Sequence, residues 1–304
     1  MENRVIARGA LAGLIAGVLG FVFAFIYAEP VIDKAIDYES GRDDVLNALH
    51  QAAGLPTEPD GPEIFSRTFQ STIGIATGLI GVSIAFGLLV AVAFLILHGR
   101  VKVRPRVLVW SIAAFGFLAI FLLPFAKYPA NPPAIGHTFT IEARGALYLA
   151  MVAMSVILLG GAVFFARYLA KRVGWMRAVV ISGLAFLVVF GIVCALMPML
   201  GDLPANVSMT NEFGFARAAT ETPQPITNVL NEALTVDGIT YAPGQIVYPG
   251  FDADSLWLFR WYSLLNQAII WGTIALVFGA LAEKLLGHPK DVVPATEDRE
   301  AVAA

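Results

Sequence analysis

Six apolar stretches, each nearly free of charge, recur along the chain and alternate with charged or proline-rich connections. A helix that crosses about 30 Å of hydrocarbon needs roughly 20 apolar residues, and each stretch is long enough. The pattern therefore predicts an all-α integral membrane protein with six transmembrane helices in contact with membrane lipid. The predicted spans are approximately 7–28, 70–97, 107–125, 145–166, 178–200 and 259–282.

Basic and acidic residues are divided unevenly among the connections. Segments 98–106 and 167–177 have only basic charges, and together with residues near both termini they hold 13 of the 20 Lys and Arg. Because positively charged connections stay in the cytoplasm, we predict that both termini are cytoplasmic. Two large extracytoplasmic loops, 29–69 and 201–258, follow, and with Glu142 they hold 17 of the 23 acids. We predict a membrane domain over 1–286 and a disordered cytoplasmic tail over 287–304.

The two long loops have local patterns of their own. Residues 31–54 repeat apolar side chains at helical spacing, beginning with Val31 and Ala35, which predicts an amphipathic helix. The segment 234–250, LTVDGITYAPGQIVYPG, has an Asp-Gly pair between two short β-type runs and predicts a hairpin. A small extracytoplasmic cap is expected from these elements.

Small residues repeat along the first span, where Gly9, Gly13 and Gly17 are spaced four apart. Such a face lets another helix approach closely and gain dispersion contacts, which replace the hydrophobic drive that lipid does not supply. We predict packing within the bundle, with dimerisation or a partner contact as the alternative. The same prediction applies to the second span, at Gly74, Gly78 and Gly81.

Composition removes several classes of function. Of the 304 residues, 58% are hydrophobic and 14% charged, against about 25% charged in soluble domains. With a net charge of −3, no basic face remains for a nucleic-acid partner. The single cysteine, Cys194, excludes an internal disulfide. No nucleophile, zinc-protease or phosphate-loop motif occurs, so we predict no enzyme and no bound cofactor.

Potential metal ligands are scattered over the predicted outer loops. No two histidines are three or four residues apart, so no single helix provides a metal site. A site would have to be assembled from several loops, and Co(II) accepts the imidazole and oxygen donors available there. Our candidate ligands are Glu29, His50, His137, Glu142 and Asp202.

A few polar residues lie at or near the spans. Gln70 and Gln267 are candidates for a polar path, although interhelical hydrogen bonds are the simpler role for a buried carboxamide. Arg67, Arg144 and Arg260 stand at the predicted outer ends of helices, where an arginine reaches the headgroups at little cost. Anchoring is the simpler role for each, and Arg260 is also a candidate path residue.

The segment FLLPFAKYPANPPAIGH, residues 121–137, connects the third and fourth spans on the predicted outer face. Pro124 ends or kinks the helix, and Lys127 and Tyr128 are suited to the headgroup region. Three further prolines, Pro129, Pro132 and Pro133, stiffen the turn. We predict a rigid outer gate that presents Asn131 and His137.

Three motifs, KYPANPPAIG, ARGALYLAMVAMSV and LWLFRWYSLLNQAIIWGTIALVFGALAE, resemble the CbtA family of probable cobalt transporter subunits. The resemblance places 127–133 on the family's loop after the third span, and Arg260 and Gln267 on its final helix. It implies a multi-pass protein of the bacterial inner membrane that transports cobalt for cobalamin synthesis. It also implies a small membrane partner, CbtB, that supplies histidines.

Two other functions remain open from the residues alone. A non-transporting scaffold or assembly protein would use its polar residues for packing only. An intramembrane enzyme acting on a lipid would need several acid, base or nucleophilic groups at one depth, and the spans contain few. Metal flux through the reconstituted protein separates transport from scaffolding.

Overall fold

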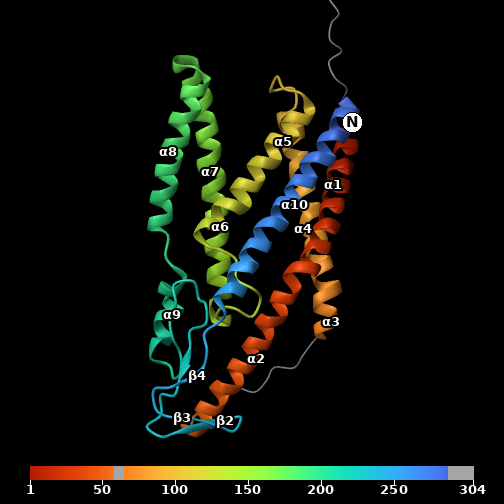
Figure 1. Ribbon diagram of the computed structural model, residues 1–304. Coiled ribbons are helices and arrows are strands. Elements are labelled where there is room, and N and C mark those ends of the chain that lie inside the picture. Colours follow the sequence, from red (N-terminus) through yellow and green to blue (C-terminus); the bar gives the residue numbers. More distant parts are fainter. Residues whose placement is uncertain (58–64, 287–304) are drawn as a thin grey trace, which may run out of the picture.

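The computed structural model describes residues 1–57 and 65–286, and six helices within them are long and apolar enough to cross a membrane. The predicted fold class and the six spans are therefore confirmed, whereas the predicted tail over 287–304 lies outside the described residues. Figure 1 shows these helices above a cap of short strands and turns at one end. We name the end with the cap the outer end, following the predicted topology.

The first helical run is much longer than a membrane span. It passes from α1 (Glu2–Phe23) through one π-helical turn, η1 (Ala24–Ala28), into α2 (Glu29–Ala52). Figure 1 shows α2 leaving the bundle and reaching the cap. The predicted amphipathic helix is confirmed, and Val45 and Leu49 are its buried contacts with the cap.

Four helices form a close-packed bundle: α1, α4 (Ile75–Leu97), α5 (Pro105–Gly116) and α10 (Ala253–Leu286). Their shared core includes Phe94, Trp271 and Phe278. The short helix α3 (Arg67–Phe69) and the π-helical turn η2 (Gln70–Gly74) lead into α4 at the outer end. We call this group the four-helix bundle.

Glycines of α1 set the approach of α4. A Cβ atom at Gly13 would lie 2.4 Å from the carbonyl oxygen of Ser83, and one at Gly9 would lie 2.6 Å from that of Gly87. Real Cβ atoms do not come so close to backbone, so the predicted glycine packing is confirmed for the first span. It does not hold for Gly78 and Gly81 of the second span, which have no neighbour within 4 Å.

A helical hairpin stands beside this bundle. After α5, the π-helical turn η3 (Phe117–Leu122) and α6 (Leu123–Lys127) lead through a loop and η4 (Thr138–Thr140) to α7 (Ile141–Val173) and α8 (Trp175–Leu196). The turn between α7 and α8 is Gly174, whose φ of 84° and ψ of 157° suit glycine alone. The hairpin packs on η3 and α6 through Tyr128, Met151 and Phe190.

The cap, residues 201–252, begins within η5 (Leu200–Asp202) and continues through α9 (Pro204–Ser208) and η6 (Met209–Asn211). Strand β1 (Ile226–Thr227) pairs antiparallel with β4 (Ile246–Tyr248), and β2 (Leu234–Val236) with β3 (Ile239–Tyr241). Asp237 and Gly238 join β2 and β3 with φ values of 49° and 77°, which confirms the predicted Asp-Gly hairpin.

Candidate functional site: the outer corner

The proline-rich segment lies where α6, α7 and the cap meet. Pro124 lies inside the continuous helical run from Pro105 to Lys127, directly after the π-helical turn η3, so it does not end the helix, which continues to Lys127. At the end of α6, the Lys127 Nζ donates to the carbonyl of Met197 at 2.9 Å, and the Tyr128 hydroxyl donates to that of Pro198 at 2.9 Å. Both side chains therefore hold the outer end of α8.

Asn131 connects this segment to α10 and to the cap. Its Nδ2 donates to the carbonyl of Thr220 at 3.0 Å, and its Oδ1 accepts from Arg260 Nη2 at 3.0 Å. The Nε of Arg260 also donates to the carbonyl of Ala130 at 3.2 Å. Arg260, which we expected to serve mainly as an anchor, is thus tied into the loop from the first turns of α10.

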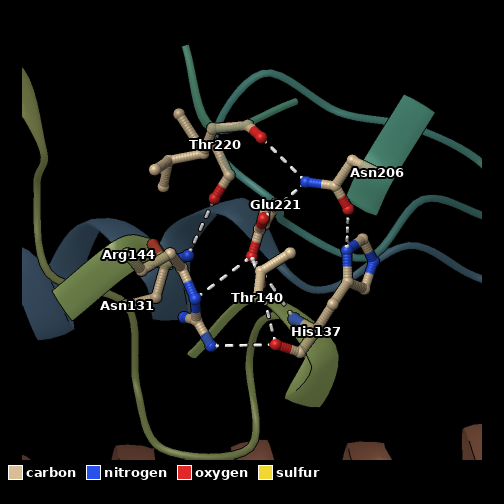
Figure 2. A network of polar contacts seen from close by, with 8 residues as sticks. Asn131, His137, Thr140, Arg144, Asn206, Thr220 and Glu221 are labelled. Carbon is tan, nitrogen blue, oxygen red and sulfur yellow. Dashed lines mark hydrogen bonds and ion pairs between the residues drawn. The ribbon is translucent and has the colours of Figure 1, made fainter. Parts of the chain in front are cut away.

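A buried carboxylate joins the cap to the start of α7, as Figure 2 shows. Glu221 is fully buried and accepts from Thr140 Oγ1 at 2.7 Å and from Asn206 Nδ2 at 2.5 Å. The Nε of Arg144 lies 3.3 Å from Oε2 of the same carboxylate. A buried charge needs such compensation, because its desolvation costs several kcal/mol. We call these residues the Glu221 network.

His137 enters the network through its Nδ1 atom. Its Nδ1 lies 2.7 Å from Oδ1 of Asn206, whose Nδ2 is already donating to Leu200 and Glu221. Because an amide oxygen only accepts, Nδ1 is the donor in this contact, and Nε2 is the ring nitrogen left for another partner. The ring packs against Phe139 and Phe215, with centroids 5.0 Å away in each case.

A pocket of about 760 Å³ lies beside this corner. Residues 128–136 form one wall, η3 with α6 and the first turns of α7 form others, and Glu39 of α2 and Phe259 of α10 complete it. Burial raises the pKa of the Glu39 carboxyl above its usual range, and the nearby Asp43 raises it further. Arg144 places a positive charge in the same pocket. We call it the outer-corner pocket.

The five candidate metal ligands are not brought together. Over residues 1–57 and 65–286 no group of three or more His, Cys, Asp or Glu is arranged to hold a metal. Glu29 pairs with Arg67, which also binds Asp33. The other candidates are separate: His50 Nδ1 lies 3.1 Å from the carbonyl of Pro56, Asp202 lies 4.0 Å from Arg217, Glu142 is exposed on α7, and His137 is in the Glu221 network.

The two glutamines proposed for a polar path differ in position. Gln70 is exposed, and its Nε2 donates to the carbonyl of Phe65 at 3.0 Å, so it holds the start of its own helix. Gln267 instead has a buried Oε1, as Asn266 next to it has a buried Oδ1, and neither oxygen has a hydrogen-bond partner in the described part of the chain. Of the two glutamines, Gln267 is therefore the one that offers an unpaired acceptor inside the bundle, beside that of Asn266.

Glu221, Thr140 and Asn206 at the centre of the corner were not singled out by the sequence, whereas His137 and Arg144 were. Glu221 is one acid among seven in its loop, and its partners Thr140, Arg144 and His137 are 77 to 84 positions away. A useful signal would have been ARG at 143–145, because an arginine at a helix start beside a proline-rich turn needs a nearby acid. Nothing local identified which acid it was.

Comparison with known proteins adds one result. A family model described as probable cobalt transporter subunit (CbtA) matches residues 2–283, nearly the whole chain. No curated protein and no solved structure matches the chain. The matched region includes the proline-rich segment, the Glu221 network and all six spans except the last three residues of the sixth.

Proposed function

The chain belongs to the CbtA family of probable cobalt transporter subunits, and from that membership we propose that it is the membrane subunit of a cobalt uptake system. Cobalt is then the transported substrate, and the chain itself has neither catalytic activity nor a resident cofactor. We assign it to the inner membrane of a bacterium, with the cap outside, where uptake would serve cobalamin synthesis.

One observation supports an entry point for cobalt on the side of the membrane where the cap lies. His137 is held by Asn206 through Nδ1, so that Nε2 is the ring nitrogen left to bind a metal ion. Co(II) accepts imidazole nitrogen, and a hydrogen bond to the other ring nitrogen orients such ligands in known metal sites. One imidazole does not hold an ion alone, so we assign further donors to a small histidine-bearing membrane partner of the CbtB kind.

The proline-rich segment is the gate in this proposal. Asn131 bonds both the cap, at Thr220, and α10, at Arg260. Three prolines fix neighbouring φ angles, so the segment moves as a unit once these bonds break. Lys127 and Tyr128 hold the end of α8 from the same segment. Movement of the gate is thereby coupled to the hairpin.

Cobalt uptake by cells that lack the gene and express the protein or its variants tests the proposal. We expect His137→Ala to lower uptake of radiolabelled cobalt at limiting supply by about tenfold or more, because loss of a ligand weakens metal binding at least as much as loss of its orienting partner. Asn131→Ala should also lower uptake. Immunoblots of membranes would show that both variants remain in place.

His98→Ala is the matched control, since His98 lies at the opposite end of the bundle and stacks on Phe94. It should transport at the level of the unchanged protein. Equal uptake by the His137 and His98 variants would contradict an entry site at His137, while leaving the family assignment intact.

Scaffolding is the second candidate function. The observation in its favour is that the side chains of Lys127, Tyr128 and Asn131 are all used in internal hydrogen bonds. Purified protein in liposomes, with and without the partner, distinguishes the two. Cobalt flux that depends on this chain supports transport, and its absence in every combination supports a scaffold.

A further inference from the structure

Exposed tryptophans lie along α10 beside the outer-corner pocket. Phe259, which lines it, is flanked along α10 by Trp257 and Trp261, and these indoles are 60% and 44% exposed. Tryptophans concentrate at the membrane–water interface. Tyr128, which follows the end of α6, lines the opposite wall. The pocket therefore faces the boundary between headgroups and acyl chains.

A positive group with a spare donor lies in this pocket. The Nε of Arg144 is paired with Glu221, and its Nη2 donates to the carbonyl of His137 at 3.1 Å. Its Nη1 makes no hydrogen bond to any described residue. Gly136, with φ of 132°, leaves room for it, since a Cβ there would come within 2.6 Å of Nη1. The guanidinium is thus fixed by two partners and retains a donor for a ligand.

A negative group in the same pocket is also unpaired. Glu39 is partly buried, and its carboxylate has no hydrogen bond or ion pair among residues 1–57 and 65–286. The pocket therefore holds an unpaired carboxylate, with Asp43 nearby, and one free N–H donor on an arginine whose charge Glu221 already compensates. A purely anionic headgroup would be repelled by Glu39.

The rest of the wall is apolar. Phe121 and Phe125 lie along η3 and α6, and Tyr148 lies two turns into α7. Ile141, at the start of α7, lines the pocket and is 58% exposed, so the pocket opens toward the protein's outer surface at the membrane. Its volume of about 760 Å³ lies within the usual range for small-molecule sites. Contact with a hydrocarbon chain is more favourable for this apolar wall than contact with water.

We propose that the outer-corner pocket binds a membrane phospholipid whose headgroup has both a phosphate diester and a primary ammonium. The phosphate accepts from Arg144 Nη1, and the ammonium donates to Glu39. The first part of an acyl chain lies against Phe121, Phe125 and Tyr148. This binding goes beyond the proposed cobalt transport and does not depend on it.

Purified full-length protein in detergent tests the assignment through the thermal midpoint, followed by tryptophan fluorescence. The probes are lysophospholipids of one chain length with ethanolamine, glycerol or choline headgroups, and glycerophosphoethanolamine, which has no acyl chain. We expect the ethanolamine lysolipid to raise the midpoint most. Glu39→Gln should weaken its binding by about tenfold, as expected for loss of one charge-assisted hydrogen bond, and should leave the glycerol lysolipid no weaker.

Two comparisons between variants separate loss of lipid binding from loss of folding. Arg144→Gln should weaken binding of all three lysolipids, but it also disturbs the Glu221 network, whereas Glu39→Gln leaves that network whole. Glu232→Gln, on the exposed surface of the cap, is the control that should retain the ethanolamine preference. Equal shifts with all headgroups, or an ethanolamine preference that survives Glu39→Gln, would overturn the proposal. An equal shift with glycerophosphoethanolamine would overturn the lipid assignment in favour of a soluble ligand.

Discussion

The four-helix bundle and the α7–α8 hairpin are both made of apolar helices, yet they are held in different ways. In the bundle, glycines of α1 meet the backbone of α4, and 39% of the most apolar window of the first helical run is buried. In the run that begins with α8 the corresponding share is 6%. Its large aliphatic side chains face outward, where lipid covers them. Apolar length alone therefore makes a span, but small residues decide which spans pack closely.

The hairpin is held in place mainly by polar contacts at its outer end, whereas the bundle is held by close packing of its helices. Lys127 and Tyr128 hold the outer end of α8, and Arg144 at the start of α7 pairs with Glu221 of the cap. The cap is fixed in turn to α2 through Val45 and Leu49. The hairpin is thus attached to the bundle chiefly at its outer half, through η3, α6 and the cap.

The largest loss of stability is expected from Glu221→Ala, which removes the polar contact between the cap and α7. It leaves Arg144 without its counter-charge and Asn206 and Thr140 without their acceptor. Breaking a buried pair costs about 3 to 5 kcal/mol, and we expect the lower value because the Arg144 side chain is 27% exposed. Thermal unfolding in detergent would show a lower midpoint, and limited proteolysis would show earlier cleavage in the cap.

Glu232→Ala is the control, because this acid lies exposed on the same cap. If the two variants unfolded at the same temperature, the Glu221 network would not be what attaches the cap to α7.

Much of the bundle could be predicted from sequence, since its determinants are local. Spans follow from apolar length, the face of α1 from glycines four apart, and the β2–β3 hairpin from Asp237 and Gly238. The proline-rich segment 121–137 could be assigned to the connection between the third and fourth spans for the same reason. The Glu221 network could not be predicted, because Glu221 contacts residues that lie 77 to 84 positions away and no short sequence pattern indicates such a pairing.

A second prediction compares the two regions with the same substitution. Gly13→Ala puts a methyl group 2.4 Å from the Ser83 carbonyl oxygen, so α1 and α4 must separate, at a cost of about 1 to 3 kcal/mol. Gly183→Ala, on α8, meets nothing within 4 Å and should be neutral or slightly stabilising, because alanine is the better helix former. Thermal midpoints of both variants measure the difference. Equal destabilisation would contradict the contrast in packing.

A third prediction concerns the start of α10, which belongs to the bundle and also bears Arg260. Asp252 accepts from the backbone N–H of Ser255 at 2.9 Å, and hydrogen bonds from this residue lower the pKa of its carboxyl. Asp252→Ala should cost about 1 kcal/mol, as for loss of a helix N-cap. The lost stability is present above the unfolded pKa near 3.8 and disappears as pH falls through the lower folded value. Asp254→Ala is the control, and an equal loss from it would contradict the capping role.

The smallest expected effect lies in the pocket between the two regions, at Glu39. Its pKa is raised in the folded protein, chiefly by burial, so the folded state holds the proton more tightly than the unfolded state does. Stability should therefore decrease as pH rises above about 4.5 through the folded pKa, opposite in sign to Asp252. In lipid-free detergent at neutral pH, Glu39→Gln should raise the thermal midpoint by about 1 °C, because an unpaired charge is removed. With the ethanolamine lysolipid present the order should reverse, since the unchanged protein then gains an ion pair that the variant lacks. A midpoint that is insensitive to this substitution in both conditions would mean that the carboxylate faces open water and that the two regions are joined without it.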